Sequence, residues 1–234
     1  MTPRVSVIMA TYNWAPVLPW SIASALDQTF TDFELLVVGD GCTDESGDVV
    51  EAIGDARVRW LNLPTNTGHQ WGPNNAGIRE ASGELIAYLG HDDLWLPSHL
   101  ELVLRAIDGG ARFAHGTTVH MIPEEGPTFL RPETWAYEPG DWVPPTAVVH
   151  DRDLIDTVGP WRPASETGLL DPDTDLWARM AAVVGPPHWV RRTTNVKMAA
   201  ALRRDVYRDR PHHERSTGWD ASATHTIPRP SCRK

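Results

Sequence analysis

Short apolar runs alternate along the first half of the chain with segments in which apolar residues recur every three or four positions. Four runs have the length and the β-branched or aromatic content of buried strands, and they cover residues 5–10, 33–38, 58–63 and 85–89. The periodicity between them predicts helices over residues 17–26, 45–53 and 73–81. This alternation predicts an α/β fold in which a mostly parallel sheet carries helices on both faces.

The second half of the chain follows a less regular pattern. A helix with an apolar face is predicted after Pro97 and ends at Gly109 and Gly110. Further elements are predicted as strands over 112–115, 117–121 and 146–150, a short helix near Leu154 and a longer helix over 171–184. We expect a single domain over residues 1–214, made of halves 1–108 and 109–214, and a polar tail over 215–234.

Composition narrows the classes of partner. The 234 residues are 41% hydrophobic and carry a formal net charge of -10. This acidic balance argues against a nucleic-acid partner, which needs clustered Lys and Arg. Cys42 and Cys232 lie far apart and have no zinc-binding spacing. Because no apolar run reaches the roughly 20 residues of a membrane span and no signal region is found, we expect no transmembrane segment and a cytoplasmic location, with peripheral membrane contact left open.

Polar residues follow the apolar runs where the predicted strands end. They are Thr11, Tyr12 and Asn13 after the first run, Asp40 after the second, Asn66, Thr67 and Gly68 after the third, and His91, Asp92 and Asp93 after the fourth. Taken alone, Asp40 fits a plain turn, and Asp92 with Asp93 fits a helix cap. Carboxyl ends of parallel strands share one edge of a sheet, and ligands bind there in such folds. Together these residues therefore predict a binding site at that edge.

Asp92 and Asp93 are adjacent carboxylates, and their repulsion at a buried strand end calls for a cation. Carboxylate oxygens suit Mg²⁺ or Mn²⁺, which bind through one or two carboxylates together with substrate phosphates. His91 either adds a ligand, which would favour Mn²⁺, or points away. This strand end therefore predicts a site for a metal and a diphosphate.

The strand ends belong to four segments, VSVIMATYN, FELLVVGDGCTDES, NTG…NNAGIREASGELIAYL and GHDDLWLPSHLE. In their order and spacing they resemble the motifs of the family 2 glycosyltransferases, which have the GT-A fold. The resemblance is strong over residues 3–108 and weaker from 146 to about 214. It implies an inverting transferase that moves a sugar from a nucleoside-diphosphate sugar, with a UDP-sugar favoured. The implied acceptor is a hydroxyl of a glycan, a lipid-linked compound or a small molecule, as in polysaccharide or glycoconjugate biosynthesis.

The resemblance also assigns roles to single residues. It places seven on the donor side: Thr11, Tyr12, Asn13, Asp40, Asn75, His91 and Asp92. Thr11 and Asp40 match contacts to the base and the ribose. Asp92 matches the last Asp of the family's DxD metal motif and Asp93 the Asp that often follows it, so both are expected to hold Mn²⁺ or Mg²⁺.

Two positions depart from the family pattern. Gly39 stands where the family usually has the first Asp of an Asp-Asp pair, and Gly90 stands where it usually has the first Asp of DxD. One acid is therefore missing from each of two sites, which puts metal affinity in question. The departures leave open an alternative, a degenerate and non-catalytic module that binds sugar nucleotides or glycans.

The second half offers a candidate for the base that takes the acceptor's proton. Residues 171–179 resemble the family segment Glu-Asp-x-x-Leu-x-x-Arg, with Asp173 on its Asp, Arg179 on its Arg and Pro172 in place of its Glu. By this resemblance Asp173 is favoured as the base. The remaining candidates are Asp175, Glu166 and His213. Asp171, Asp173 and Asp175 would also suit a helix N-terminus, where the helix dipole favours acidic side chains.

Other readings fit less well. A dinucleotide-binding dehydrogenase needs G-x-G-x-x-G after its first strand, and a P-loop enzyme needs G-x-x-x-x-G-K-[ST]; the chain has neither. A nucleotidyltransferase usually has a Gly-rich loop with Lys or Arg at that place, which is also missing. The pair His212 and His213, in a segment rich in Arg, would either close over the diphosphate or lie in a solvated tail.

Overall fold

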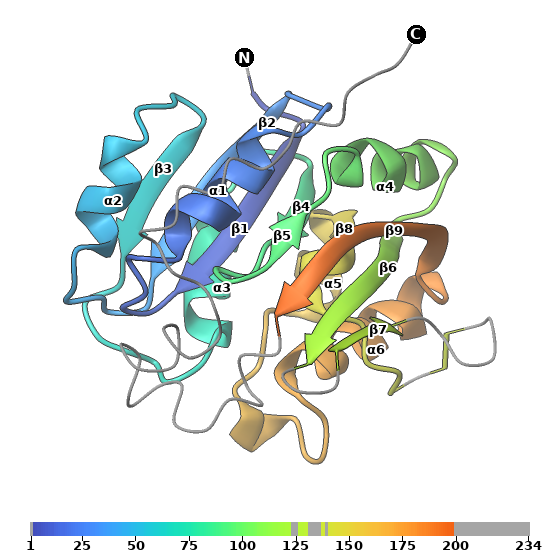
Figure 1. Ribbon diagram of the computed structural model, residues 1–234. Helices are drawn as coiled ribbons and strands as arrows, with labels where there is room; N and C mark the ends of the chain where they lie inside the picture. Colours follow the sequence, from blue (N-terminus) through green and yellow to red (C-terminus); the bar gives the residue numbers. More distant parts are fainter. Residues whose placement is uncertain (1, 123–125, 131–136, 139, 199–234) are drawn as a thin grey trace, which may run out of the picture.

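The computed structural model describes residues 2–122, 126–130, 137–138 and 140–198, which form one sheet of nine strands between two layers of helices (Figure 1). This arrangement confirms the predicted α/β architecture. The predicted tail over 215–234, together with His212 and His213, lies outside the described residues.

The elements of the first half match the sequence prediction to within two residues at each end. They are β1 (Val5–Thr11), α1 (Leu18–Leu26), β2 (Phe33–Gly39), α2 (Ser46–Ala52), β3 (Val58–Asn62), α3 (Trp71–Glu80) and β4 (Leu85–Tyr88). Their boundaries follow the change from continuous apolar runs to three- or four-residue periodicity, which is the strongest local signal in the chain.

The second half holds the remaining elements. They are β5 (Leu94–Trp95), α4 (His99–Asp108), β6 (Phe113–Ile122), β7 (Gly126–Leu130), the 3-10 turn η1 (Pro145–Ala147), β8 (Val148–Asp151), α5 (Asp153–Val158), the 3-10 turn η2 (Ala164–Glu166), α6 (Pro172–Val184) and β9 (His188–Met198). The two strands predicted over 112–121 are one strand, β6, whose pairing with β9 shifts register around Gly116 and Thr117. The sequence prediction missed β5, β7 and β9.

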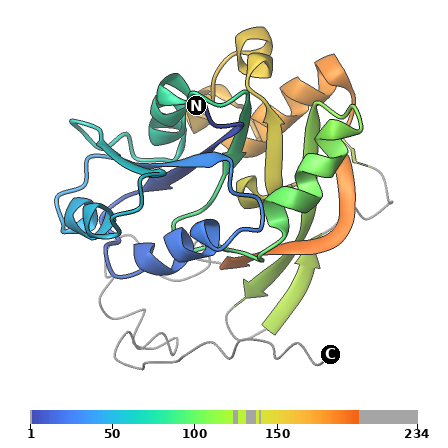
Figure 2. The ribbon, with the colours of Figure 1, turned by 90° about the horizontal axis from the view of Figure 1, so that it is seen from above.

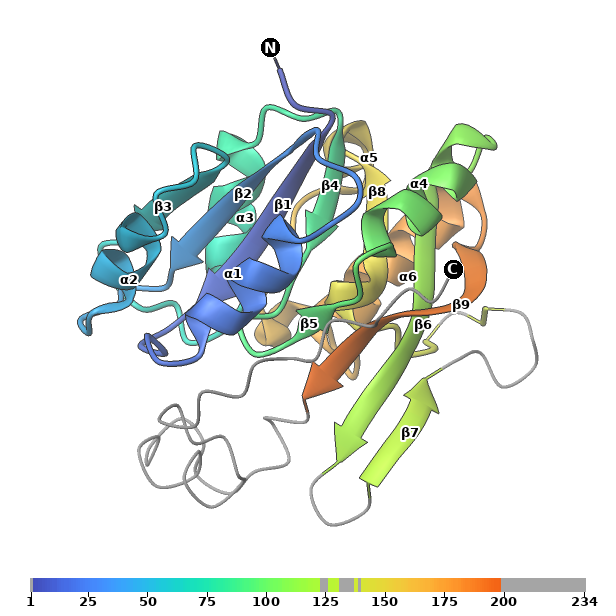
Figure 3. The same ribbon diagram turned by 45° about the horizontal axis from the view of Figure 1, so that its top comes forward.

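The sheet joins the two halves of the chain. Its strands run in the order β3-β2-β1-β4-β8-β6-β9-β5, with β7 paired to β6 outside this path. β1 pairs in parallel with β2 and β4, and β2 with β3. The second half is mixed, because β8 is antiparallel to β4 and β6, whereas β9 is parallel to β6 and antiparallel to β5. Figure 3 shows these strands continuing the sheet beyond β4.

Apolar side chains on both faces of the strands give the molecule two cores. Val7 and Met9 of β1 face one side, where they pack under α1, α2 and α4, while Ile8 faces the other, under α3, α5 and α6. Figure 2 shows the two layers of helices on opposite faces of the sheet. Burial on both faces fixes the register of the central strands, because a slip of one residue would exchange the faces of every side chain.

This register brings three strand ends to one edge. Thr11 and Gly39 are partners at the ends of β1 and β2, and the N–H of Asp40 donates a 2.8 Å hydrogen bond to the carbonyl of Thr11. β4 ends at Tyr88, the partner of Ile8, so the residues that follow it run along the same edge. The polar residues predicted to meet there are thus brought together.

Candidate functional site

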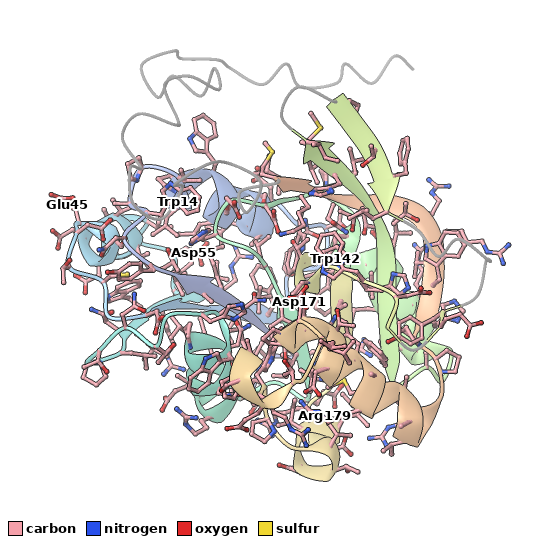
Figure 4. All side chains as sticks on the ribbon, turned by 90° about the horizontal axis from the view of Figure 1, so that it is seen from below. Trp14, Glu45, Asp55, Trp142, Asp171 and Arg179 are labelled. Atoms are coloured by element: carbon pink, nitrogen blue, oxygen red, sulfur yellow. The ribbon has the colours of Figure 1, made fainter. Side chains whose placement is uncertain are left out.

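Thr11, Asp40 and His91 are each held at this edge by a defined partner. Nδ1 of His91 lies 3.0 Å from Oγ1 of Thr11 and ties the end of β4 to the end of β1. Asp40 is buried, and its Oδ1 accepts hydrogen bonds of 2.9 Å from the N–H and the hydroxyl of Thr67. Figure 4 looks onto this edge and shows Trp14 beside α1. The rings of Trp14 and His91 are nearly perpendicular, with 4.4 Å between their centroids. These contacts give the edge a defined shape.

Asn13 fastens the loop after β1 to the loop after β2. Its φ is 46°, a conformation that asparagine adopts more readily than most residues. Its Oδ1 accepts hydrogen bonds from the N–H groups of Thr43, at 2.7 Å, and Asp44, at 3.3 Å. Asp44 in turn accepts one of 3.1 Å from the N–H of Ala15. Asn13 therefore shapes the loop, and the donor contacts expected of Asn13 and Tyr12 stay predictions.

Asn75 of α3 is bonded at both ends of its amide to the backbone of Trp161. Its Nδ2 donates to the carbonyl of Trp161 at 2.9 Å, and its Oδ1 accepts from the N–H at 3.0 Å. Trp161 is buried, and its indole N–H donates to the hydroxyl of Tyr88 at 3.1 Å. Asn75 thus joins α3 to the loop after α5, while its expected contact with the nucleotide stays a prediction.

Side chains of β3 fill the space beside Gly39. A Cβ at position 39 would lie 2.5 Å from Oδ1 of Asn62 and 2.6 Å from the ring of Trp60. Asn62 is itself fixed, since Oδ1 accepts from the N–H of Cys42 and Nδ2 donates to its carbonyl, both at 2.9 Å. The first acid of the Asp-Asp pair would therefore have no room here unless Trp60 and Asn62 moved.

Asp92 and Asp93 have different surroundings. Asp92 is half-buried, whereas Asp93 is 1% exposed. Oδ1 of Asp93 accepts a 3.0 Å hydrogen bond from the N–H of Met198, and Oδ2 lies 3.4 Å from Nζ of Lys197. Burial raises the pKa of Asp93 to about 6; Lys197 acts against this rise and Asp92 adds to it. The carboxylate of Asp93 is thus directed at β9, and Asp92 is the more accessible of the two.

Asp173, the predicted base, lies buried in the first turn of α6. Its Oδ2 accepts a 3.2 Å hydrogen bond from the indole N–H of Trp142, and its Oδ1 accepts one of 2.8 Å from the N–H of Thr174. Burial raises the pKa of Asp173 despite these hydrogen bonds. Figure 4 shows Trp142 close to Asp171 at the start of α6. A carboxylate with raised pKa and fixed orientation suits a general base.

Asp175, the alternative base, forms an ion pair with Arg179. Its Oδ2 accepts a 2.9 Å hydrogen bond from Nε of Arg179. Nη1 of Arg179 also donates to the carbonyls of Val158, at 2.6 Å, and Gly159, at 3.0 Å. Asp175 thus helps to hold α6 against the end of α5, an arrangement that favours Asp173 for the base.

The two other candidates for the base lie elsewhere. Glu166 is exposed in the turn η2, and His213 lies outside the described residues.

Two residues of the site escaped the sequence prediction: Trp142 and Lys197. Thr67 was expected at the edge as part of the strand end that follows the third run, and its hydrogen bonds to Asp40 confirm that position. Trp142 lies in an irregular segment, where no periodicity reveals a partner. Lys197 had only a weak signal, because residues 189–198 contain several β-branched side chains, as strands often do, but no regular alternation of apolar and polar positions.

The family profile described as Glycosyl transferase family 2 matches residues 6–157, which include Thr11, Asp40 and Asp92. The chain belongs to glycosyl transferase family 2. The match confirms the resemblance drawn from the strand-end motifs. Asp173 and Lys197 lie beyond the matched segment.

Curated relatives of this family 2 chain include two bacterial β-1,3-glucosyltransferases. One, from Escherichia coli, is named for UDP-Glc and α-D-GlcNAc-diphosphoundecaprenol; it is 37% identical over 98 residues, which are 42% of this chain and 38% of that protein. Another, from Campylobacter jejuni, is named for GalNAc(5)-diNAcBac-PP-undecaprenol; it is 32% identical over 129 residues, 53% of this chain and 40% of that protein. The match therefore spans less than half the length of these relatives.

Solved structures share the fold at lower identity. S. aureus TarS in complex with UDP superposes with a TM-score of 0.66 and 20% identity, covering 84% of this chain and 60% of that one. The mannosyltransferase PcManGT from Pyrobaculum calidifontis, in complex with GDP-Man and Mn²⁺, has a TM-score of 0.61 and 20% identity, covering 87% of this chain and 59% of that one. With the family match, these structures confirm the predicted GT-A fold.

The donor set fits a divalent ion that shares its coordination with substrate. Across the described residues, no cluster of three or more His, Cys, Asp or Glu forms a cage of protein ligands. Mg²⁺ and Mn²⁺ sites of nucleotide enzymes commonly use one or two carboxylates plus phosphate oxygens, and Asp92 offers such a carboxylate. Asp93, predicted as a second ligand, has both oxygens directed at β9.

In the part of the chain that the structure describes, no helix has both the length and the apolar character that crossing a bilayer requires.

Proposed function

We propose that this family 2 protein transfers a sugar from a nucleoside-diphosphate sugar to an acceptor hydroxyl, with inversion at the sugar carbon. The observation that carries the proposal is the position of Lys197. Its Nζ lies 3.4 Å from Oδ2 of Asp93, and the charges of Asp93, Asp92 and Asp173 all act to raise its pKa. Donor-side acids and a buried carboxylate of raised pKa therefore share one site. A single-displacement transfer needs both groups, whereas a module that only binds nucleotides would not need Asp173.

The nucleotide end is assigned to Thr11 and Asp40. The two hydrogen bonds from Thr67 fix the carboxylate of Asp40, and a fixed carboxylate at a strand end is suited to the hydroxyls of a ribose. UDP is favoured as the nucleotide, since S. aureus TarS binds UDP and UDP-GlcNAc and the E. coli relative is named for UDP-Glc. The complex of PcManGT with GDP-Man supports GDP as the alternative.

The chemical step is assigned to Asp173. The acceptor oxygen forms a bond to the sugar's anomeric carbon as the bond from that carbon to the diphosphate oxygen breaks, and the electron pair leaves with the diphosphate. Asp173 takes the proton of the acceptor hydroxyl. The N–H groups of Trp142 and Thr174 orient its carboxylate, and its raised pKa increases its affinity for that proton.

Asp92 is assigned to the divalent ion, Mn²⁺ or Mg²⁺. When bound, such an ion stabilises the negative charge that grows on the departing diphosphate. Among the structural neighbours, PcManGT is described with Mn²⁺. Asp93 stays a predicted ligand whose present contacts are with Met198 and Lys197.

A lipid-linked saccharide is the proposed acceptor. Both glucosyltransferase relatives are named for sugars carried on undecaprenol through a diphosphate. An acceptor of this kind is anchored in a bilayer, so the protein would work in the cytoplasm with peripheral contact at the membrane. Glycan and small-molecule acceptors remain the alternatives, and an acceptor panel with the lipid carrier separates them.

Asp173→Asn and Asp175→Asn form a matched pair that tests the function. Asp173→Asn keeps the size of the side chain but removes its ability to take a proton. We expect its kcat to fall by about 100-fold or more, with the dissociation constant for the nucleoside diphosphate unchanged. Asp175→Asn breaks the ion pair with Arg179, so it should lower Tm and leave most of kcat in the folded protein. Release of nucleoside diphosphate from a panel of UDP- and GDP-sugars, with Mn²⁺, measures kcat, and calorimetry measures affinity.

The same assay separates an enzyme from a binding module. A degenerate module would bind the nucleotide but consume no donor with or without Mn²⁺. Normal turnover by Asp173→Asn, with Asp175→Asn inactive but stable, would exchange the two assignments. Loss of nucleotide binding in Asp173→Asn would show that this residue contacts the donor instead of the acceptor.

A further inference from the structure

The space beside Gly90 is filled by the carboxylate of Asp93. A Cβ at position 90 would lie 2.4 Å from Oδ2 of Asp93 and 2.9 Å from its Cγ. The N–H of Asp93 donates a 3.1 Å hydrogen bond to the carbonyl of Gly90, which closes the turn between them. In this chain, an acid at position 90 would therefore need the carboxylate of Asp93 to move.

The carboxylate of Asp93 is held in place by two residues of β9. The N–H of Met198 and Nζ of Lys197 meet its two oxygens at 3.0 and 3.4 Å. β5, directly after Asp93, pairs with β9 through Leu94 and Val196, so the backbone of β9 is fixed next to the acid. These contacts place a lysine of β9 beside the strand end that carries Asp92 and Asp93.

Lys197 is a fixed positive charge among acids. Its Nζ lies 3.4 Å from Oδ2 of Asp93, the neighbour of Asp92 in the chain, and its side chain is 23% exposed. An ammonium of this kind binds phosphate oxygens as a point charge.

The net charge of the site depends on position 90 and on Lys197. An acid at position 90 would add a negative charge that a metal must offset, whereas here that acid is absent and Lys197 adds a positive charge. A nucleoside diphosphate brings negative charge to the same strand end. We propose that Lys197 binds the diphosphate of the donor directly and supplies from β9 part of the positive charge that otherwise comes from the metal alone.

This inference rests on the proposed function, and it makes a prediction for binding without metal. In excess EDTA, UDP should bind the wild type about tenfold or more tightly than uridine, because a charge-assisted bond to phosphate adds to the contacts of the nucleoside. Lys197→Met keeps the length of the side chain and removes the charge, so UDP should then bind within about twofold of uridine. Lys197→Arg should restore most of the difference.

Calorimetry with UDP and uridine, in EDTA and in Mn²⁺, gives all these affinities. Arg192→Met is the matched control, because it removes a positive charge from an exposed position on the same strand; both affinities should stay at their wild-type values. Uridine affinity and Tm report whether each variant is folded. If Lys197→Met does not fold, the wild type and Lys197→Arg decide the question alone.

Two results would overturn the role of Lys197. One is equal binding of UDP and uridine to the wild type in EDTA when Mn²⁺ still strengthens UDP. The other is UDP binding by a folded Lys197→Met that matches the wild type in EDTA. Failure of the proposed function gives a different pattern, in which no nucleoside diphosphate, UDP or GDP, binds the wild type with or without Mn²⁺.

Discussion

At the scale of single residues, the surroundings of Gly39 and Gly90 explain why no acidic side chain fits at either position. From the sequence, Gly39 and Gly90 are missing acids that point to a weakened site. In the structure, Trp60 and Asn62 fill the space beside Gly39, and Asp93 fills the space beside Gly90. The sequence identified the departures but not what fills the space beside them, because Trp60 and Asn62 come from another strand and the carboxylate of Asp93 is placed by contacts with β9.

Substitutions at positions 90 and 93, alone and together, test this packing. Gly90→Asp alone should destabilise the protein by about 1–3 kcal/mol, since its side chain must displace the carboxylate of Asp93. Asp93→Ala alone should also destabilise it, because Met198 and Lys197 lose their acceptor. The double variant should be more stable than the sum of the two losses predicts. Urea unfolding of the four proteins gives the coupling.

Additive losses would contradict this prediction, because they would mean that the side chains at positions 90 and 93 do not compete for one space.

At the scale of elements, prediction from sequence depended on how local the signal is. β1 to β4 were found because each is an apolar run bounded by polar residues, so the local pattern is enough. β5 has only two residues, and its pairing with β9 comes from a contact about 100 positions away. The place of the acids at the strand ends was therefore predictable, while the partner strand that brings Lys197 to Asp93 was not.

Glu34, at the start of β2, joins three elements through one buried carboxylate. Oε1 accepts hydrogen bonds from the hydroxyl of Ser6, at 2.7 Å, and from the N–H and hydroxyl of Ser82, at 2.8 and 2.6 Å. Burial alone would raise the pKa of Glu34, but these hydrogen bonds and the charge of Arg59 lower it below its ordinary 4.5. The ionised carboxylate is therefore more stable in the folded than in the unfolded chain.

The sign of this shift predicts a pH dependence. A lowered pKa adds stability that is fully present above about 4.5 and is lost as the pH falls through the folded value. Glu34→Gln should cost about 1–2 kcal/mol at pH 7 and progressively less below pH 4.5. Glu84→Gln, at a carboxylate whose side chain is 71% exposed, is the control and should change little. Urea unfolding at pH 7 and pH 3 makes the comparison; a loss for Glu34→Gln that is equal at both would contradict the shift.

At the scale of the whole molecule, one sheet brings the residues proposed to bind the donor and the proposed base to a single edge. The first half sets Thr11, Asp40 and Asp92 at the ends of parallel strands, and the second half adds Asp173 from α6 and Lys197 from β9. The fold class and the meeting of the polar strand ends could be predicted, because parallel strands determine where their ends meet. The surroundings of Asp173 could not, because Trp142 comes from an irregular segment and its hydrogen bond depends on tertiary packing.

The central claim is that this edge transfers sugar with inversion and that Asp173 takes the proton. The most direct test follows the first sugar released to water from an α-linked donor that the wild type consumes, by proton NMR before the anomers interconvert. The account predicts that the β-anomer appears first, and that Asp173→Asn releases it about 100-fold more slowly while still binding the nucleotide. The α-anomer appearing first, or an undiminished rate in Asp173→Asn, would contradict it.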